Sequence, residues 1–129
     1  MPADAPNSPI GILSISPTRE DHAAVRGVCH GASYQVATAE TCHQALRRLI
    51  RGGISVVVCE RELPDGGWHD VLHGTQSLGS PLLVVTSRLA DDRLWAEVLN
   101  LGGFDVIAKP FVESELRRVL ESACRRTQA

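Results

Sequence analysis

Apolar residues along this chain form two kinds of pattern, and the two alternate. Five short, nearly continuous apolar runs occur at 10–16, 34–37, 54–59, 81–87 and 104–108. Such runs, bounded by Gly, Pro or polar residues, are typical of strands that are buried on both faces of a parallel sheet. After each run, apolar residues recur at every third or fourth position, which predicts an amphipathic helix.

The clearest helical pattern follows the second run. Its apolar residues have the spacing i, i+3, i+4, i+7 and i+8: Cys42, Ala45, Leu46, Leu49 and Ile50. Three arginines between and after them are expected to face water, and a Gly-Gly pair at 52–53 ends the helix. Further helices are predicted after 18, from about 67, over about 90–101 and from about 112. In the helix over 90–101 we expect Leu94, Val98 and Leu101 to face the core.

Five strands that alternate with five helices through short links require a parallel sheet with right-handed crossovers. Spacing alone does not set the strand order, and 2-1-3-4-5 is a common solution for a five-stranded unit of this size. We therefore expect a single doubly wound α/β domain over residues 10–126. Residues 1–9, rich in Pro, and residues 127–129 are expected to be disordered or loose tails.

Composition narrows the range of functions. The chain has 129 residues, of which 43% are apolar and 22% charged, and its formal net charge is −2. This balance argues against binding to nucleic acid, which usually shows as a basic patch. No apolar run approaches the roughly 18 residues of a membrane span, and the first residues do not resemble a signal peptide. We therefore expect a cytoplasmic protein without a membrane partner.

The cysteines do not form a metal-binding pattern. Cys29, Cys42, Cys59 and Cys124 are widely spaced and include no CxxC pair. Two of them precede a histidine, but adjacent residues on a helix point away from each other. We expect reduced thiols and no metal site.

One carboxylate stands where sheets of this kind place their functional sites. Glu60 ends the third apolar run, and in open α/β sheets the carboxyl ends of the strands line the binding crevice. The only lysine among the 13 basic side chains, Lys109, follows the fifth run and precedes Pro110. A compact ammonium binds anions differently from a planar guanidinium, so we expect a specific role for Lys109.

Three segments carry a resemblance to a known family. Residues 56–67 read VVVCERELPDGG, residues 84–87 read VVTS, and residues 102–111 read GGFDVIAKPF. Their order and spacing resemble those of the receiver domains of bacterial two-component response regulators, over about residues 10–126. The resemblance implies a flavodoxin-like fold with strand order 2-1-3-4-5 and a role in two-component signal transduction or a phosphorelay.

The resemblance also implies roles for Glu60, Thr86 and Lys109. Glu60 stands at the phosphoacceptor position, and Thr86 and Lys109 match pocket residues of the family. In the family the lysine contacts the phosphoryl group, and the Lys-Pro bond is cis. We therefore expect a Glu60–Lys109 ion pair, with Thr86 as a candidate third member, and a cis Lys109–Pro110 bond.

Other positions depart from the family pattern. Ser16 and Pro17 replace the acidic pair that holds Mg²⁺ during phosphoryl transfer. Glu60 carries its carboxylate one methylene further out than Asp, which disturbs an in-line geometry. Val106 replaces the aromatic switch residue of the fifth strand. We therefore expect a degenerate receiver that binds no Mg²⁺, is not an enzyme and signals independently of phosphorylation.

Two alternatives remain open. Glu20 and Asp21 could reach back as substitute metal ligands, in a receiver that is still phosphorylated through an unusual ligand set. The favoured interpretation is that they stabilise the N-terminus of the first helix through its dipole. The other alternative is a small nucleotide- or flavin-binding domain, but no Gly-rich phosphate loop follows the first strand.

The expected output surface combines the fourth helix, the fifth strand and the fifth helix, through which receivers dimerise or bind signalling proteins. We expect five charged or aromatic residues there: Asp91, Arg93, Trp95, Asp105 and Arg117. An exposed Trp among charges is typical of a binding hot spot. Trp95 could equally cover the edge of the core, and the charges could serve solubility alone.

Overall fold

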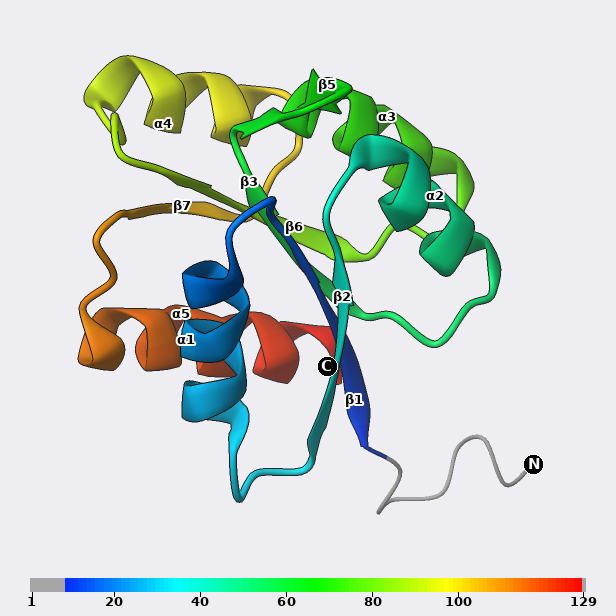
Figure 1. Ribbon diagram of the computed structural model, residues 1–129, viewed down its shortest axis with the longest axis vertical. Helices are drawn as coiled ribbons and strands as arrows, with labels where there is room; N and C mark the ends of the chain where they lie inside the picture. The colour runs from blue at the N-terminus through cyan, green and yellow to red at the C-terminus, as the bar shows by residue number, and fades with distance from the viewer. Residues whose placement is uncertain (1–8, 129) are drawn as a thin grey trace.

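A computed structural model describes residues 9–128, so the expected N-terminal tail lies outside the described residues except for Pro9. Five parallel strands form one sheet: β1 (Ile10–Ile15), β2 (Tyr34–Ala39), β3 (Val56–Glu60), β6 (Leu82–Ser87) and β7 (Asp105–Ala108). Their order is β2-β1-β3-β6-β7 (Figure 1). This confirms the predicted order 2-1-3-4-5, because β4 (Glu62–Leu63) and β5 (Gly66–Gly67) pair only with each other.

Five helices cover the sheet from both sides (Figure 1). α1 (Arg19–Cys29) and α5 (Glu113–Thr127) pack on one face, and α2 (Cys42–Ile50), α3 (Trp68–Ser77) and α4 (Asp92–Asn100) pack on the other. The C-terminal tail was predicted one residue too long, because α5 continues through Thr127. Within residues 9–128, no helix combines the length and the apolar character that crossing a bilayer requires.

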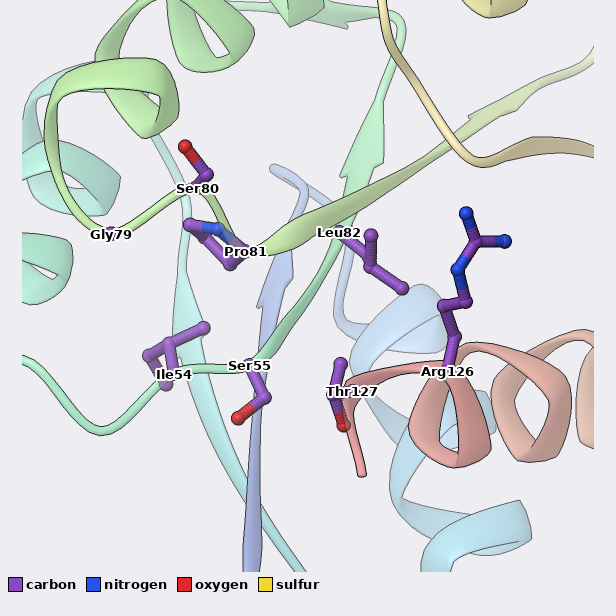
Figure 2. Close-up of a pocket in the computed structure, with 8 residues that line it drawn as sticks. All are labelled: Ile54, Ser55, Gly79, Ser80, Pro81, Leu82, Arg126 and Thr127. Carbon is purple, nitrogen blue, oxygen red and sulfur yellow. The ribbon is translucent and has the colours of Figure 1, made fainter. Parts of the chain in front are cut away.

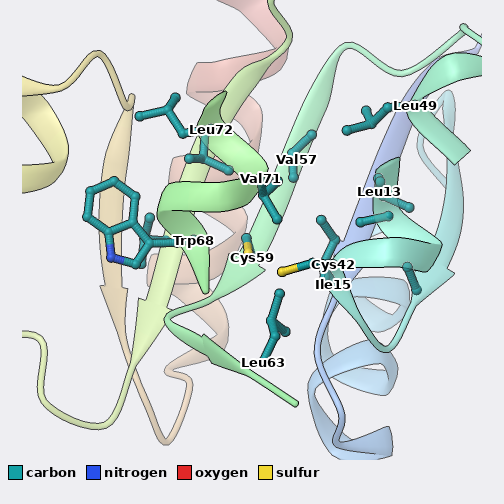
Figure 3. Packing of buried hydrophobic residues seen from close by; sticks show 14 of the residues in the cluster. Leu13, Ile15, Cys42, Leu49, Val57, Cys59, Leu63, Trp68, Val71 and Leu72 are labelled. Carbon is teal, nitrogen blue, oxygen red and sulfur yellow. The ribbon is translucent and has the colours of Figure 1, made fainter. Parts of the chain in front are cut away.

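The central strand β3 supplies both apolar layers. Val57 and Cys59 point toward α2, α3 and α4, whereas Val56 and Val58 point toward α1 and α5. Trp68, only 1% exposed, fills the first layer from the start of α3 (Figure 3). This two-sided burial explains why the strand reads as a continuous apolar run. It also leaves the end of the strand as the first place where a charged side chain can stand.

Two helix positions that were expected to follow the apolar pattern are exposed. Ile50 is 68% exposed and Leu101 is 46% exposed. Ile50 is the last residue of α2, and Leu101 is the C-cap of α4. At a helix end the chain leaves for the next strand, so the periodic pattern no longer determines which side faces the sheet.

The turn after β3 also fixes the start of α2. Asp65 Oδ1 accepts the backbone N–H of Cys42 at 2.7 Å, and Asp65 Oδ2 accepts that of His43 at 3.0 Å. These two hydrogen bonds lower the pKa of Asp65 below its ordinary value. A carboxylate at this place satisfies free N–H groups of the helix and interacts favourably with its dipole. The turn is thereby tied to the neighbouring helix.

Candidate functional site

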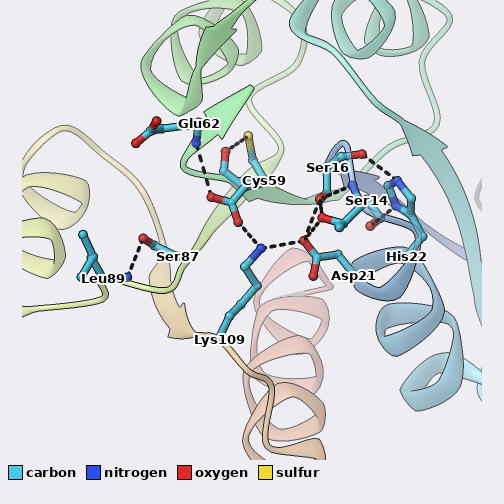
Figure 4. A network of polar contacts seen from close by, with 11 residues as sticks. Ser14, Ser16, Asp21, His22, Cys59, Glu62, Ser87, Leu89 and Lys109 are labelled. Carbon is cyan, nitrogen blue, oxygen red and sulfur yellow. Dashed lines mark hydrogen bonds and ion pairs between the residues drawn. The ribbon is translucent and has the colours of Figure 1, made fainter. Parts of the chain in front are cut away.

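The carboxyl ends of the parallel strands bring together residues that are distant in the sequence. Ser16 follows β1, Asp21 lies in the first turn of α1 and Lys109 follows β7 (Figure 4). Glu60 is the last residue of β3. Thr86 lies beside Glu60, because the two residues are register partners in β6 and β3. Sheets of this topology place their sites at this edge.

Lys109 lies between two carboxylates. Its Nζ is 2.8 Å from Asp21 Oδ2 and also contacts Glu60 Oε1. The three side chains are largely buried, with 10% to 14% of each exposed. The predicted Glu60–Lys109 ion pair is therefore confirmed, and so is the cis Lys109–Pro110 bond. The second carboxylate was not predicted.

We had expected Asp21 to act only on the helix dipole, but its side chain is part of the site. Its Oδ2 accepts hydrogen bonds from Ser16 Oγ at 2.6 Å and from Thr18 Oγ1 at 3.2 Å, besides that from Lys109. Burial raises the pKa of Asp21, but the hydrogen bonds from Lys109 and Ser16 and the charge of Lys109 outweigh it. The pKa of Asp21 therefore lies below its ordinary value, and the carboxylate is charged at neutral pH.

The same balance acts on the ammonium. Burial lowers the pKa of Lys109, but hydrogen bonds and charges from Asp21 and Glu60 raise it above its ordinary value. The site thus contains one cation between two carboxylates, all three held in place by direct contacts. Because the carboxylate oxygens already contact the ammonium, few of their lone pairs are free for another ligand.

Thr86 does not join this ion cluster. Within residues 9–128, the Thr86 hydroxyl makes no hydrogen bond to Glu60 or Lys109. Thr86 is instead buried, and its backbone carbonyl accepts the N–H of Arg61 at 2.8 Å. The other carboxylate oxygen of Glu60 accepts the N–H of Glu62 at 3.4 Å. The contact of Thr86 with this segment is therefore a backbone hydrogen bond to Arg61, the residue after Glu60.

A buried histidine supports the Asp21 side of the site. His22 Nε2 lies 2.9 Å from the carbonyl of Ser16, and His22 Nδ1 lies 2.8 Å from Ser14 Oγ. A carbonyl oxygen can only accept, so Nε2 donates. The histidine therefore fixes the backbone of Ser16, whose hydroxyl bonds to Asp21. Sequence reasoning missed His22, and the available signal was a histidine next to Asp21 on a helix that starts at the strand end.

The donor set does not fit Mg²⁺. This ion prefers octahedral oxygen ligands, with carboxylates supplying charge. Here both carboxylates are paired with Lys109, the Ser16 hydroxyl is bonded to Asp21, and Pro17 is exposed and has no side-chain oxygen. Among residues 9–128, no three His, Cys, Asp or Glu side chains gather in a way that could hold a metal ion.

A hollow of about 340 Å³ opens over Glu60 and Lys109 and is also lined by Arg61 and Arg88. Another hollow, of about 390 Å³, lies at the opposite ends of the strands, where β3 and β6 begin (Figure 2). Arg126 is the only ionisable side chain in its lining. Of these two hollows, only the one over Glu60 and Lys109 has several ionisable side chains in its lining.

The structure places the residues expected at the output surface in several different environments. Trp95 is 51% exposed, and with Asp91 it lines a groove of about 420 Å³ between α4, β7 and α5. Arg93 is exposed on α4, and Asp105 is half-buried, where it accepts the N–H of Val106 at 2.8 Å. Trp95 is therefore too exposed to serve only as a cover for the core.

Arg117 was wrongly assigned to this surface. Its Nη1 donates to the carbonyl of Val28 in α1 at 3.2 Å, so the side chain lies on the α1 side of α5. Glu115, two residues earlier, does line the groove beside α4. Two residues on a helix are about 200° apart, which explains why only one of them can face β7.

The chain is similar in sequence to known transcriptional regulators. It is 36% identical over 97 residues to the transcriptional regulatory protein KdpE of Mycobacterium tuberculosis, a match that covers 74% of this chain and 42% of that protein. It is 31% identical over 105 residues to the probable transcriptional regulatory protein y4xI of Sinorhizobium fredii, covering 81% and 46%. The chain thus spans less than half the length of these relatives. No family model matches it.

Solved structures share the fold at lower sequence identity. A two-component response regulator from Clostridium difficile superposes with a TM-score of 0.83 at 19% identity, covering 93% of this chain and 99% of the other. A CheY-like response regulator receiver domain protein from Methanospirillum hungatei gives 0.83 at 16% identity, covering 94% and 98%. The CheX–CheY–BeF3–Mg²⁺ complex from Borrelia burgdorferi gives 0.81 at 15% identity, covering 90% of each chain. Taken with the sequence similarity and the strand-end motifs, the shared fold identifies this chain as a receiver domain of the response-regulator family.

Proposed function

We propose that this receiver domain signals independently of phosphorylation, as a protein-interaction module rather than an enzyme. The observation that carries the proposal is the placement of Lys109 between Asp21 and Glu60. In this arrangement both carboxylates already contact the ammonium, so the groups that would bind a metal ion and a phosphoryl group are occupied within the chain. The domain then has a permanent conformation at its strand ends, and its output depends on which protein it binds.

Glu60 supports the proposal from the phosphoacceptor position. Its carboxylate is engaged on both oxygens, by the Lys109 ammonium and by the N–H of Glu62. The longer side chain places a negative charge beside Lys109, where a phosphoryl group would be expected on an Asp. A phosphate group has a charge of about −2 and three acceptor oxygens, so the mimicry by one carboxylate is partial.

Asp21 supports the proposal from the metal position. A receiver that transfers a phosphoryl group needs a divalent cation to neutralise developing charge. Here Ser16 and Pro17 supply no carboxylate, and the one provided by Asp21 accepts hydrogen bonds from Ser16, Thr18 and Lys109. The ammonium therefore takes the place that a cation would occupy among these oxygens, and Mg²⁺ would have to break the ion pair to bind.

The output part of the proposal rests on the groove between α4, β7 and α5. Val106 lines this groove and has no aromatic ring that could alternate between exposed and buried positions. A fixed surface of this kind suits a partner that binds constitutively. Trp95, exposed beside Asp91 and Asp92, has the composition of a binding hot spot.

The test is an NMR titration of the backbone amides, first with millimolar Mg²⁺ and then with beryllofluoride. We expect no saturable shift at Glu60, Thr86 or Lys109. The matched control is the variant Ser16→Asp/Pro17→Asp/Glu60→Asp, which restores the carboxylates of a phosphorylatable site and whose spectrum shows directly whether it is folded. Saturable shifts in the unmodified chain would overturn the proposal and favour a receiver with an unusual ligand set.

A further inference from the structure

Two arginines of α2 and the arginine at its C-cap form a basic surface that the site does not use. Arg47, Arg48 and Arg51, which we call the arginine patch, line a hollow of about 450 Å³ together with Thr38 and Gln44. Among residues 9–128, none of the three forms an ion pair with a carboxylate. Three like charges on one helix repel one another, so this surface favours an anionic partner.

The patch also has an apolar neighbour. Ile50 is 68% exposed and lies one helical turn after Arg47. Arg48 Nη1 donates to the carbonyl of Gly52 at 2.9 Å, which leaves its positive charge without a carboxylate among residues 9–128. A large aliphatic side chain beside such charged groups is a combination that protein interfaces use. The arginine patch with Ile50 therefore fits a surface that contains both carboxylates and an apolar or aromatic group.

The groove between α4, β7 and α5 is such a surface. Its lining contains three carboxylates and one aromatic side chain: Asp91, Asp92, Glu115 and Trp95. In the described part of the chain, none of the three carboxylates forms an ion pair. Trp95 lies within reach of Asp91 and Asp92 because residues three and four apart share a helix face. We call this surface the acidic groove.

We propose that a second copy of this chain docks its arginine patch into the acidic groove. Guanidinium groups bind carboxylates through paired hydrogen bonds and stack on indole rings, so each feature of the patch has a counterpart in the groove. This inference rests on the proposed function, which assigns the groove as the output surface. It goes further by naming the partner and the part of the partner that binds.

The positions of the two surfaces determine the kind of assembly. α2 packs over β2 and β1, whereas α4 packs over β7, so the two surfaces lie toward opposite edges of the same helix layer (Figure 1). A two-fold dimer through the arginine patch alone would place like charges against each other. A head-to-tail contact pairs opposite charges and leaves a free patch and a free groove at the two ends, so the assembly continues as an open array unless its rotation closes a ring.

The test is sedimentation velocity on four samples at rising protein concentration, in low and high salt. The first is the unmodified chain. The second is Arg47→Glu/Arg51→Glu, which reverses the patch, and the third is Asp92→Arg/Glu115→Arg, which reverses the groove. The fourth is an equimolar mixture of these two variants. The control is Arg26→Glu/Arg125→Glu, which reverses two exposed arginines, one on α1 and one near the end of α5, that form no ion pair among residues 9–128.

We expect the average mass of the unmodified chain to exceed that of a dimer as concentration rises, and to fall in high salt because screening shortens the range of the charges to a few ångströms. Each reversed variant alone should associate at least about tenfold more weakly, since like charges then meet. Their mixture should regain association, because a reversed patch matches a reversed groove. The control should behave as the unmodified chain.

Three results would overturn the inference. The first is a monomer at all concentrations in low salt. The second is association that the reversed patch leaves unchanged, and the third is a mixture no more associated than its components. If Arg47→Glu/Arg51→Glu has no effect while Trp95→Ala abolishes association, the groove is a two-fold contact, and the proposed function stands without this inference. The Mg²⁺ and beryllofluoride titration decides the phosphorylation part separately.

Discussion

Lys109 Nζ lies 2.8 Å from Asp21 Oδ2, although 88 residues separate the two in the chain. The contact joins the first turn of α1 to the loop after β7, and Glu60 at the end of β3 completes it. One ammonium group therefore links the segments that follow β1 and β7 to the end of β3. Because all three side chains are mostly buried, removal of the ammonium would leave two carboxylates without a cation.

Lys109→Met should destabilise the domain substantially. The variant leaves Asp21 and Glu60 facing each other in a largely buried place without a cation. Loss of one partner from a buried ion pair costs about 3 kcal/mol at the lower end of the usual range, and we expect a loss in free energy of unfolding of that order. Urea unfolding at pH 7 measures it.

Arg93→Met is the control for this measurement. Arg93 is exposed on α4 and has no ion pair within residues 9–128, so its replacement should change stability by no more than about 0.5 kcal/mol. The destabilisation of Lys109→Met should also shrink at acidic pH, because a protonated Asp21 no longer carries a charge that needs the ammonium. Equal effects of the two substitutions at pH 7 would contradict the role of Lys109.

The fold was predictable because the apolar pattern reports burial, and burial sets the layers. Val56 to Cys59 read as a two-sided strand and alternate between the two apolar clusters. The pattern failed where burial stops constraining the chain. Ile50 and Leu101 stand at helix ends, and the β4–β5 hairpin is too short to show a period.

The site was predictable at strand ends and less so on helices. Glu60 and Lys109 follow strands whose register the sheet imposes, so their meeting could be expected. Asp21 lies on a helix, where an acidic residue in the first turn already has a local explanation in the dipole. The prediction for Arg117 was wrong for a related reason, because a small error in helical phase moves a side chain from one neighbouring element to another.

A pair of glycine substitutions tests how tightly the sheet is packed at its first strand. A Cβ on Gly11 would overlap the backbone carbonyl of Gly53, whereas a Cβ on Gly27, within α1, would meet no atom within 4 Å. Gly11→Ala should therefore lower the free energy of unfolding by about 1–3 kcal/mol through overpacking. Gly27→Ala should raise it by about 0.5–1 kcal/mol, because alanine favours a helix interior. Thermal unfolding of both variants gives the signs, and an equally stable Gly11→Ala would contradict the close approach.

Asp65→Ala should weaken the start of α2. The substitution removes the acceptor of two backbone N–H groups, those of Cys42 and His43. Loss of such a cap lowers the free energy of unfolding. The two amides should also exchange faster with solvent, which NMR measures residue by residue. Glu62→Ala, in the same turn, is the control, and unchanged exchange at Cys42 and His43 in Asp65→Ala would show that the cap is not needed.

The stability of the unmodified chain should depend on pH at both ends of the range. The pKa of Asp21 is lowered, so its contribution is present above its ordinary value of 3.8 and is lost as the pH falls through the lower pKa of the folded state. The pKa of Lys109 is raised, so its contribution is present below its ordinary value of 10.5 and is lost as the pH rises through the higher pKa of the folded state.

Asp21→Asn separates the two limbs of this profile. The variant has no titrating carboxyl at that position, so its stability should decline less steeply than that of the unmodified chain as the pH falls below 3.8. It also leaves Lys109 with Glu60 as its one anionic partner, so the alkaline limb should begin at lower pH. Urea unfolding across the pH range measures both limbs, with Glu20→Gln as the exposed neighbouring control. An acid limb as steep in Asp21→Asn as in the control would show that Asp21 does not contribute through its charge, and the ion cluster would then reduce to Glu60 and Lys109.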